Sequence, residues 1–228
     1  HLDIVKELIT RKQNLAPTVE LNPDIKDFYQ FTVNDLTVKN YCAGNPVKFE
    51  VAISWEDSMK LVAAVDENWG IGSEGSLLYR FPEDMKRFKQ ITTESGIVIM
   101  GRKTFDSLGH RALKDRENWV LTRDKQFNSK NVRVFHSLDD LFTTFILEEI
   151  NPKNICVIGG AEIYKQMLPY CSKAYIAYVK AKHPRVDTYF PVNLDQDPEW
   201  VLERSEQGRE CIYLGTDYRF NYYTRILG

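Results

Sequence analysis

Residues 154–168 read NICVIGGAEIYKQML. The apolar run ICVI leads directly into two glycines, and the residues after them have the apolar spacing of a helix. A strand that turns into a helix in this way is the repeating unit of sheets with parallel strands. The double glycine lets another molecule approach the backbone closely, and the start of a helix favours anionic groups. The stretch therefore predicts a strand–helix unit with a ligand-binding turn, although many such turns contain a glycine pair.

The same alternation of apolar and helical patterns extends on both sides of this stretch. Pro82 stands where a helix can begin without losing a hydrogen bond, and Ser137 is placed to cap another helix. Strands are predicted at 60–65, 96–100, 118–122, 132–135, 154–160 and 174–181, and helices at 83–91, 102–108, 137–149 and 161–168. We therefore expect an α/β domain with a mostly parallel sheet, flanked by helices on both faces. Residues 210–226, with a Gly-Thr-Asp turn between aromatic runs, predict an antiparallel hairpin at its edge.

The first 53 residues do not continue this alternation. They predict one helix at 2–12 and short strands near 18–21, 28–33 and 36–41, which is too little to bury a core alone. The expected organisation is a front segment at 1–53, a linker at 54–58 and a main domain at 59–228.

The composition excludes several classes of function. The 228 residues carry a net charge of −2, which gives no basic surface for nucleic acid or an anionic membrane. No apolar run approaches the roughly 18 residues of a membrane span, and no signal peptide is evident. The four cysteines (Cys42, Cys156, Cys171, Cys211) form no C-x-x-C pair, so we expect free thiols, no metal and a reducing, cytoplasmic location.

Asp84 is the first residue that stands out chemically. At about 100° per residue, Phe81, Met85, Phe88 and Ile91 form one apolar arc of the helix after Pro82, and Asp84 falls in its middle. A carboxylate in that position loses water, which costs several kcal/mol unless hydrogen bonds replace it. The residues alone allow two interpretations: an acid that stabilises the helix start, or a partly buried acid beside a catalytic cleft.

Basic residues follow two of the predicted strands. The stretch GIVIMGRKT (96–104) looks like the phosphate loop of nucleotide kinases, but Arg102 occupies the required lysine position and IVIM reads as a strand. A different phosphate site remains, because Gly101 opens a helix followed by Arg102 and Lys103, and Arg123 follows the next strand. Solvated charges at strand ends are the alternative for each.

Five stretches in order carry a family resemblance: KLVAAVDENWGIG (60–72), LLYRFPEDMKRFK (77–89), VIMGRKTFDSLG (98–109), VIGGAEIY (157–164) and DTYFP (187–191). Together they resemble dihydrofolate reductase, from Met59 to the end of the chain. The resemblance implies reduction of 7,8-dihydrofolate to tetrahydrofolate, with a hydride from NADPH to C6 and a proton to N5. Dihydrofolate and antifolates are the implied ligands.

The resemblance also assigns residues to the substrate site. Asp84 is implied to hydrogen-bond the pterin, Thr188 to support Asp84, and Arg116 to pair with the glutamate α-carboxylate. Leu78 and Tyr79 replace the family's Pro-Trp, and Tyr79 can still reach a water near the pterin. The implied substrate-binding residues are Val62, Ala64, Met85, Phe88, Leu108, Leu113, Arg116, Ile158 and Tyr164.

For the cofactor, the resemblance points to NADPH, with Arg102 and Arg123 at the ribose 2′-phosphate. The peptide between Gly159 and Gly160 is implied to be cis. The implied cofactor residues are Ala64, Ile71, Gly101, Arg102, Lys103, Thr104, Leu121, Thr122, Arg123, Gly159, Gly160, Ala161, Glu162, Ile163 and Tyr164.

The front segment, ending in Val51-Ala52-Ile53, is similar to the C-terminal part of thymidylate synthase. Cys42 does not match that family's nucleophile, so synthase activity is not expected from this chain. The chain resembles part of a bifunctional fusion, which would dimerise through its synthase portion. The rival functions are a non-catalytic reductase-fold partner of a thymidylate synthase and, with less support, a nucleotide kinase.

Overall fold

The computed structural model describes residues 20–21, 28–33, 36–41, 48–53, 59–208 and 215–226. The chain divides into two compact units, one made of His1–Asp57 and Ser137–Pro152, the other of Ser58–His136 and Lys153–Gly228. The helix predicted at 2–12 and the linker predicted at 54–58 lie outside the described residues, as do Cys42 and Cys211.

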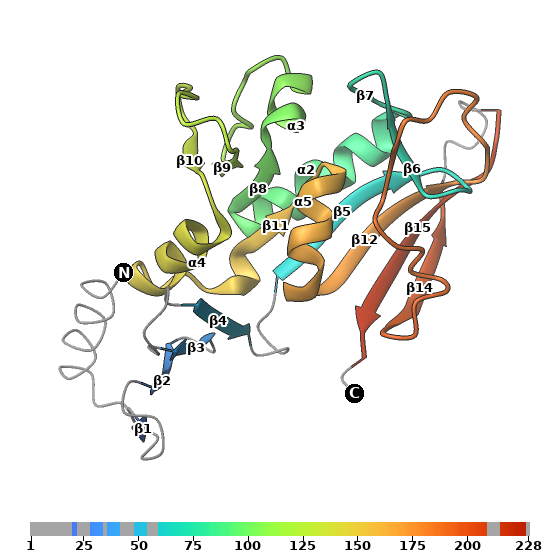
Figure 1. The fold of residues 1–228 in the computed structure, drawn as a ribbon. Helices are drawn as coiled ribbons and strands as arrows, with labels where there is room; N and C mark the ends of the chain where they lie inside the picture. The colour runs from blue at the N-terminus through green and yellow to red at the C-terminus, as the bar shows by residue number, and fades with distance from the viewer. Residues whose placement is uncertain are drawn as a thin grey trace. The chain divides into compact units, whose positions relative to one another are not determined.

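The larger unit is built on an eight-stranded sheet in the order β10-β9-β8-β11-β5-β12-β15-β14 (Figure 1). The strands from β10 to β12 pair in parallel, whereas β15 is antiparallel to both β12 and β14. The strand bounds are β5 (Met59–Val65), β8 (Ile97–Gly101), β9 (Glu117–Leu121), β10 (Arg133–Phe135), β11 (Ile155–Val157), β12 (Cys171–Val179), β14 (Trp200–Gln207) and β15 (Tyr218–Arg225). The prediction of a mostly parallel α/β sheet is confirmed.

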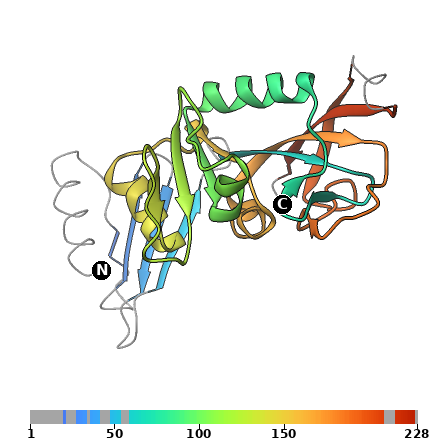
Figure 2. The same cartoon turned by 90° about the horizontal axis from the view of Figure 1, so that it is seen from above.

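Helices cover both faces of this sheet. Figure 2 shows α2 (Pro82–Ser95) along one face, with α3 (Arg102–Ser107) and α5 (Ala161–Met167) on the other. Short 3-10 turns, η2 (Pro152–Asn154) and η3 (Leu168–Tyr170), precede β11 and β12. All five residues of β8 and all three of β11 are buried, as expected for strands that helices cover on both sides.

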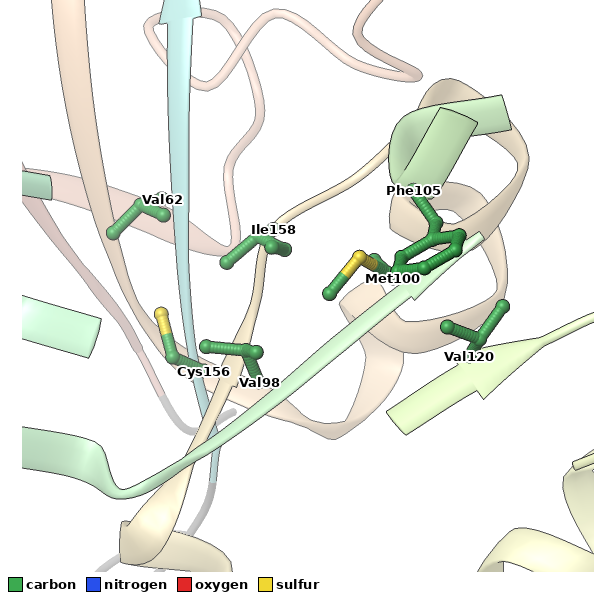
Figure 3. Close-up of a cluster of buried hydrophobic side chains, with 7 residues drawn as sticks. All are labelled: Val62, Val98, Met100, Phe105, Val120, Cys156 and Ile158. Atoms are coloured by element: carbon green, nitrogen blue, oxygen red, sulfur yellow. The ribbon is translucent and has the colours of Figure 1, made fainter. Parts of the chain in front are cut away.

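One core cluster joins these layers. Its buried members come from the central strands and from α3, and Figure 3 shows them converging from β5, β8, β9 and the end of β11: Val62, Val98, Met100, Phe105, Val120, Cys156 and Ile158. Phe88 and Ile91 of α2 pack against this cluster. The apolar arc predicted for α2 is thereby confirmed at these two positions, and the packing holds α2 on the sheet.

The structure adds strands that were not predicted in two parts of the chain. After the predicted strand at 60–65 come β6 (Gly70–Ser73) and β7 (Ser76–Leu77), which form a small sheet with β13 (Thr188–Tyr189). The predicted antiparallel pairing at the C-terminal edge is confirmed, because β15 pairs with β14 at 200–207; residues 210–214 lie outside the described residues. The sequence of β14, WVLERSEQ, is mostly exposed, so it has no apolar alternation that would have predicted a strand.

The smaller unit contains a four-stranded antiparallel sheet in the order β1-β2-β3-β4. Its strands are β1 (Glu20–Leu21), β2 (Phe28–Val33), β3 (Leu36–Tyr41) and β4 (Lys48–Ile53), so the strands predicted at 28–33 and 36–41 are confirmed. Helix α4 (Leu138–Leu147) also belongs to this unit, and the Ser137 side chain accepts the predicted capping bond from the Asp140 amide. Among the described helices, none is long and apolar enough to cross a membrane.

A buried carboxyl fixes the turn that follows β5. Asp66 is fully buried, and its Oδ1 accepts hydrogen bonds from the amides of Asn68 (2.9 Å) and Gly70 (2.8 Å). Its Oδ2 accepts from the amide of His183 at 3.1 Å. Trp69, between the first two donors, has a positive φ of 61°, a conformation that these bonds help to hold. Asp66 thus joins β5, β6 and the loop before β13.

Asp66→Ala should lower the free energy of unfolding by about 3 kcal/mol, because three amides, of which that of Gly70 is buried, lose their acceptor. Urea unfolding of the full chain measures this change. Asp197→Ala is the matched control: Asp197 Oδ1 accepts one bond from the Glu199 amide at 2.9 Å in an exposed turn. We expect the control to lose less than about 1 kcal/mol, and equal losses would contradict the role given to Asp66.

Candidate active site

A cleft opens beside α2 in the larger unit, with about 880 Å³ of empty space including its open mouth. Most of its wall is apolar, and its charged side chains are those of Arg80, Asp84 and Arg87. The lining residues are Val62, Ala63, Ala64, Leu77, Arg80, Asp84, Met85, Arg87, Phe88, Ile91, Thr104, Ser107, Leu108, Ile158, Tyr164, Tyr175, Ile176, Ala177, Phe220, Asn221 and Tyr222. A mainly apolar cleft with a few polar groups is typical of a small-molecule site.

Asp84 reaches the cleft from the first turn of α2. The helix begins at Pro82, whose fixed backbone suits that position, and Phe81 before it is buried. Loss of water around Asp84 raises the pKa of its carboxyl to about 6, and the positive charge of Arg87 opposes this rise. An acid that only stabilised the helix start would have its pKa lowered, so this environment favours the interpretation of a partly buried acid beside a cleft.

Most residues predicted for the substrate site line this cleft together. They are Val62, Ala64, Met85, Phe88, Leu108, Ile158 and Tyr164. Met85 differs from the other members of the predicted arc because 42% of its surface is exposed. Leu113 is not among the lining residues, and it packs against the core cluster drawn in Figure 3.

Arg116 lies outside the cleft lining, at the far end of α2. Its Nη1 donates to the Thr92 hydroxyl at 2.5 Å, and its Nε donates to the Lys114 carbonyl at 2.8 Å. Partial burial lowers the pKa of its guanidinium. A carboxylate that bound Arg116 would compete with these neutral acceptors, and a charged acceptor is the stronger partner.

Two glycine turns lie side by side at the carboxyl ends of β8 and β11. The Gly101 amide donates to the Gly159 carbonyl at 2.8 Å, which joins the turns. Gly101 and Gly160 are the N-caps of α3 and α5, and neither makes a side-chain capping bond. The N–H groups in the first turn of each helix can therefore donate to a ligand. The Gly159–Gly160 peptide is cis, as the resemblance implied.

Close packing explains why these positions need glycine. A Cβ on Gly101 would lie 2.9 Å from Ile163 Cγ1, and one on Gly159, at a φ of +108°, would lie 3.0 Å from the Tyr164 hydroxyl. That hydroxyl is buried and donates to the Val62 carbonyl at 2.6 Å, and burial raises its pKa. The turns thus present bare backbone, which fits the phosphates of a dinucleotide.

The predicted cationic residues stand at neighbouring strand ends. Arg102 Nε contacts Asp106 at 2.8 Å, its Nη1 contacts Asp124 at 3.5 Å, and its guanidinium lies 4.1 Å from the ring centre of Phe127. Asp124 follows Thr122 and Arg123 after β9, so the contact with Arg102 brings the two predicted strand ends together. Lys103 and Arg123 are exposed.

The remaining predicted cofactor residues distribute around these turns. Thr104 lines the cleft, Ala161, Glu162 and Ile163 form the first turn of α5, and Leu121 ends β9. Ile71 is buried in β6, and Thr122 follows β9, where its hydroxyl accepts from the Asp124 amide.

The stretch IVIM is buried strand β8, so it does not form the phosphate loop of a kinase. Among the described residues, no cluster of three or more His, Cys, Asp or Glu is placed to hold a metal ion.

Tyr79 and Thr188 do not line the cleft. Tyr79 packs against a second cluster that includes Phe81 and Ala177, and its ring meets that of His183 edge-on at 6.0 Å. The Thr188 hydroxyl donates to Asp187 Oδ1 at 2.7 Å, and among the described residues it makes no hydrogen bond to Asp84.

Sequence reasoning missed one wall of the cleft. Residues 175–177 of β12 and 220–222 of β15 line the cleft, and Arg87 of α2 contacts Phe220 and Tyr222 of this wall. The strand pattern of 174–181 was recognised, but it does not say which helix lies across it. The aromatic richness of residues 218–223 was the one available signal.

Comparisons with known proteins agree with this geometry. Residues 58–225 match the family model of dihydrofolate reductase, and residues 1–53 match that of thymidylate synthase. The chain is 36% identical over 169 residues to a dihydrofolate reductase of Staphylococcus haemolyticus, covering 74% of this chain and 96% of that protein. A dihydrofolate reductase of Buchnera aphidicola subsp. Baizongia pistaciae is 36% identical over 134 residues, or 59% of this chain and 77% of that protein.

One similar solved structure is that of a dihydrofolate reductase from Enterococcus faecalis complexed with NADP(H) and RAB-propyl. It superposes with a TM-score of 0.64 and 26% identity, covering 75% of this chain and 98% of that chain.

Asp84→Asn should stabilise the protein at alkaline pH and leave it unchanged at acid pH. Because the pKa of Asp84 is raised to about 6 in the folded protein, its ionisation costs stability as the pH rises from about 4 to about 7. Urea unfolding should show the variant more stable than wild type by about 1–3 kcal/mol at pH 8, with the difference gone near pH 4. Glu94→Gln, at the exposed far end of α2, should change little at either pH. A variant no more stable than wild type at pH 8 would contradict the desolvation of Asp84.

Proposed function

The chain belongs to the dihydrofolate reductase family, and we propose that the cleft beside α2 binds 7,8-dihydrofolate, with Asp84 controlling its reduction by NADPH. The observation that carries this proposal is the raised pKa of the Asp84 carboxyl in a cleft that is otherwise mainly apolar. Such a carboxyl is poised to titrate near neutral pH, where a group that assists proton transfer works best.

Asp84 orients the substrate and supports its protonation. Its oxygens can accept hydrogen bonds from the amino-pyrimidine side of the pterin, while Val62, Phe88 and Ile158 hold the flat rings. With the pterin bound in this way, Asp84 lies across the ring from N5 and cannot donate to N5 directly. A water then carries the proton, and the carboxylate favours the protonated pterin through its charge.

NADPH supplies the hydride that C6 receives. The residues that would hold it are those of the two glycine turns, Gly101 and Gly159–Gly160, with Arg102 and Arg123 at the ribose 2′-phosphate. Ala64 and Ile71 would position the nicotinamide face to face with the pterin. The fit rests on the bare backbone of the turns and on the contact of Arg102 with Asp124 beside Arg123.

Three further residues complete the proposed substrate site. Arg116 binds the glutamate α-carboxylate in place of the Thr92 hydroxyl that it now contacts. Tyr79 and Thr188 lie outside the cleft lining; the roles proposed for them are contact with a water near the pterin and support of Asp84, respectively. A domain boundary near 54–58 belongs to the same proposal, whereas a dimer through a synthase portion and a cytoplasmic location stay predictions.

The direct test of the proposed function is the loss of NADPH absorbance when dihydrofolate is added, which an antifolate should block. Asp84→Asn should slow hydride transfer about 100-fold at pH 7.5 and recover partly at pH 5, where the solvent protonates the substrate. Asp139→Asn, exposed on α4, is the matched control and should keep the wild-type rate. Wild-type turnover of Asp84→Asn at every pH would show that Asp84 has a different role.

The cofactor proposal is tested separately by the choice between NADPH and NADH. Arg123→Gln removes a cation from the proposed 2′-phosphate site, so KM for NADPH should rise about tenfold while KM for NADH changes little. Lys130→Gln removes an exposed cation elsewhere and should leave both constants unchanged. An equal effect of Arg123→Gln on both cofactors would place the 2′-phosphate elsewhere.

A further inference from the structure

A second hollow lies along α2, beside the substrate cleft. It is a groove with about 1440 Å³ of empty space, including open solvent, between α2 and strands β12, β14 and β15. Its lining residues are Pro82, Glu83, Lys86, Arg87, Gln90, Ile91, Glu94, Tyr175, Arg204, Glu206 and Tyr222. Arg87, Ile91, Tyr175 and Tyr222 line both hollows, so these side chains form the partition between the substrate cleft and the groove.

Arg87 is the charged member of this partition. It follows Asp84 by three residues on α2, which places the two side chains one turn apart on neighbouring parts of the helix surface. Its guanidinium lies 3.8 Å from the ring centre of Phe220. Its Nη2 contacts Glu206 Oε2 at 2.7 Å, and its Nη1 donates to the Tyr222 hydroxyl. Arg87 therefore connects the helix that carries Asp84 to β14 and β15.

Glu206 receives contacts from two cations. Besides Arg87, Arg204 Nε contacts its Oε1 at 3.2 Å, and the Tyr222 hydroxyl donates to its Oε2 at 3.3 Å. The hydrogen bond from Arg87 holds the pKa of Glu206 below its usual value, so this carboxyl is ionised near neutral pH. Arg87 is 29% exposed and Arg204 is 61% exposed. Water therefore screens the charge of Arg204 more than that of Arg87.

We propose that Arg87 is a positioning residue for Asp84: its guanidinium supplies positive charge to that carboxyl from the groove side of α2, and the ion pair with Glu206 sets how much of this charge Asp84 senses. The inference rests on the role proposed above for Asp84. It adds that a surface network on β14 and β15 tunes the proton chemistry of the substrate cleft.

The other charged and titratable groups near Asp84 do not replace Arg87 as the source of this positive charge. Among the charged side chains of the cleft, Arg80 is exposed before α2 begins. On α2, Glu83 accepts a hydrogen bond from the Tyr218 hydroxyl, and Lys86 is exposed. From the facing strands and α5 come three tyrosines, Tyr164, Tyr175 and Tyr222, and burial raises the pKa of the first two. Strand β5 lines the cleft with Val62, Ala63 and Ala64, and Ile158 after β11 adds another apolar side chain.

The proposal predicts shifts of opposite sign in two variants. Arg87→Met removes positive charge near Asp84, which makes ionisation harder and should raise the apparent pKa of Asp84 by about 0.5–1 unit. Glu206→Gln removes negative charge and frees the charge of Arg87, so the apparent pKa should fall by about half a unit. A merely structural role for the network would not give opposite signs, because both variants break the same ion pair.

Two measurements on the full chain test these shifts. The first is a carbon-13 NMR titration of the Asp84 carboxyl, whose signal is the one that Asp84→Asn removes. The second is the pH profile of hydride transfer, in which Arg87→Met should be about three- to tenfold faster than wild type at pH 8, because an Asp84 carboxylate without the opposing charge of Arg87 favours the protonated pterin more strongly. Arg87→Lys keeps the charge, and Arg204→Met changes only the exposed partner, so both should stay within about 0.2 unit of wild type.

The outcomes separate this inference from the proposed function. Coincident titrations of Arg87→Met and wild type, or shifts of the same sign in Arg87→Met and Glu206→Gln, overturn the inference. A wild-type chain that fails to oxidise NADPH with dihydrofolate overturns the proposed function, while the NMR titration still decides the link between Arg87 and Asp84. Opposite shifts in the titration with matching shifts in the rate profile support both.

Discussion

The burial of the central strands on both faces is the constraint on which the rest of the structure depends. Strands β8 and β11 expose no residue, so apolar side chains from helices must cover each side of the sheet. Phe88 and Ile91 meet this requirement on one face, and they hold α2 against the core cluster. Because Asp84 lies between Phe81 and Phe88 on the same helix, the packing that buries these rings also removes water from its carboxyl.

The pKa of Asp84 is set by two opposing effects, the loss of water around its carboxyl and the nearby positive charge of Arg87. Burial raises the pKa of its carboxyl, and Arg87 opposes that rise from the next turn of the helix. The charge of Arg87 is in turn shared with Glu206 on β14, an exposed edge strand that contributes nothing to the cleft wall. The edge strand can therefore change the electrostatic potential at Asp84, because Glu206 and Arg87 interact where water is partly excluded and screens their charges less.

The carboxyl ends of two central strands provide the geometry proposed here for a dinucleotide. Parallel strands β8 and β11 end side by side, so the two turns after them meet and share the bond from the Gly101 amide to the Gly159 carbonyl. Side chains at these glycines would collide with Ile163 and Tyr164, which pack α5 under the turns. Thus the glycines that expose backbone to a ligand are also those that allow α5 to approach the sheet closely.

The sequence by itself determined the elements and much of the site. Apolar runs predicted β5, β8, β9, β11 and β12, since buried parallel strands must be apolar along their whole length, and the helical period placed Asp84 on the apolar side of α2. It could not predict β14, whose residues are mostly exposed, nor the wall of the cleft that β12 and β15 form. Local pattern reports which face of an element is buried but not what covers it. Strand order, the placement of Thr188 beside Asp187 and the bond from Arg87 to Glu206 join residues far apart in the chain. Only the tertiary structure could decide these, because such contacts form where the whole sheet brings its distant segments together.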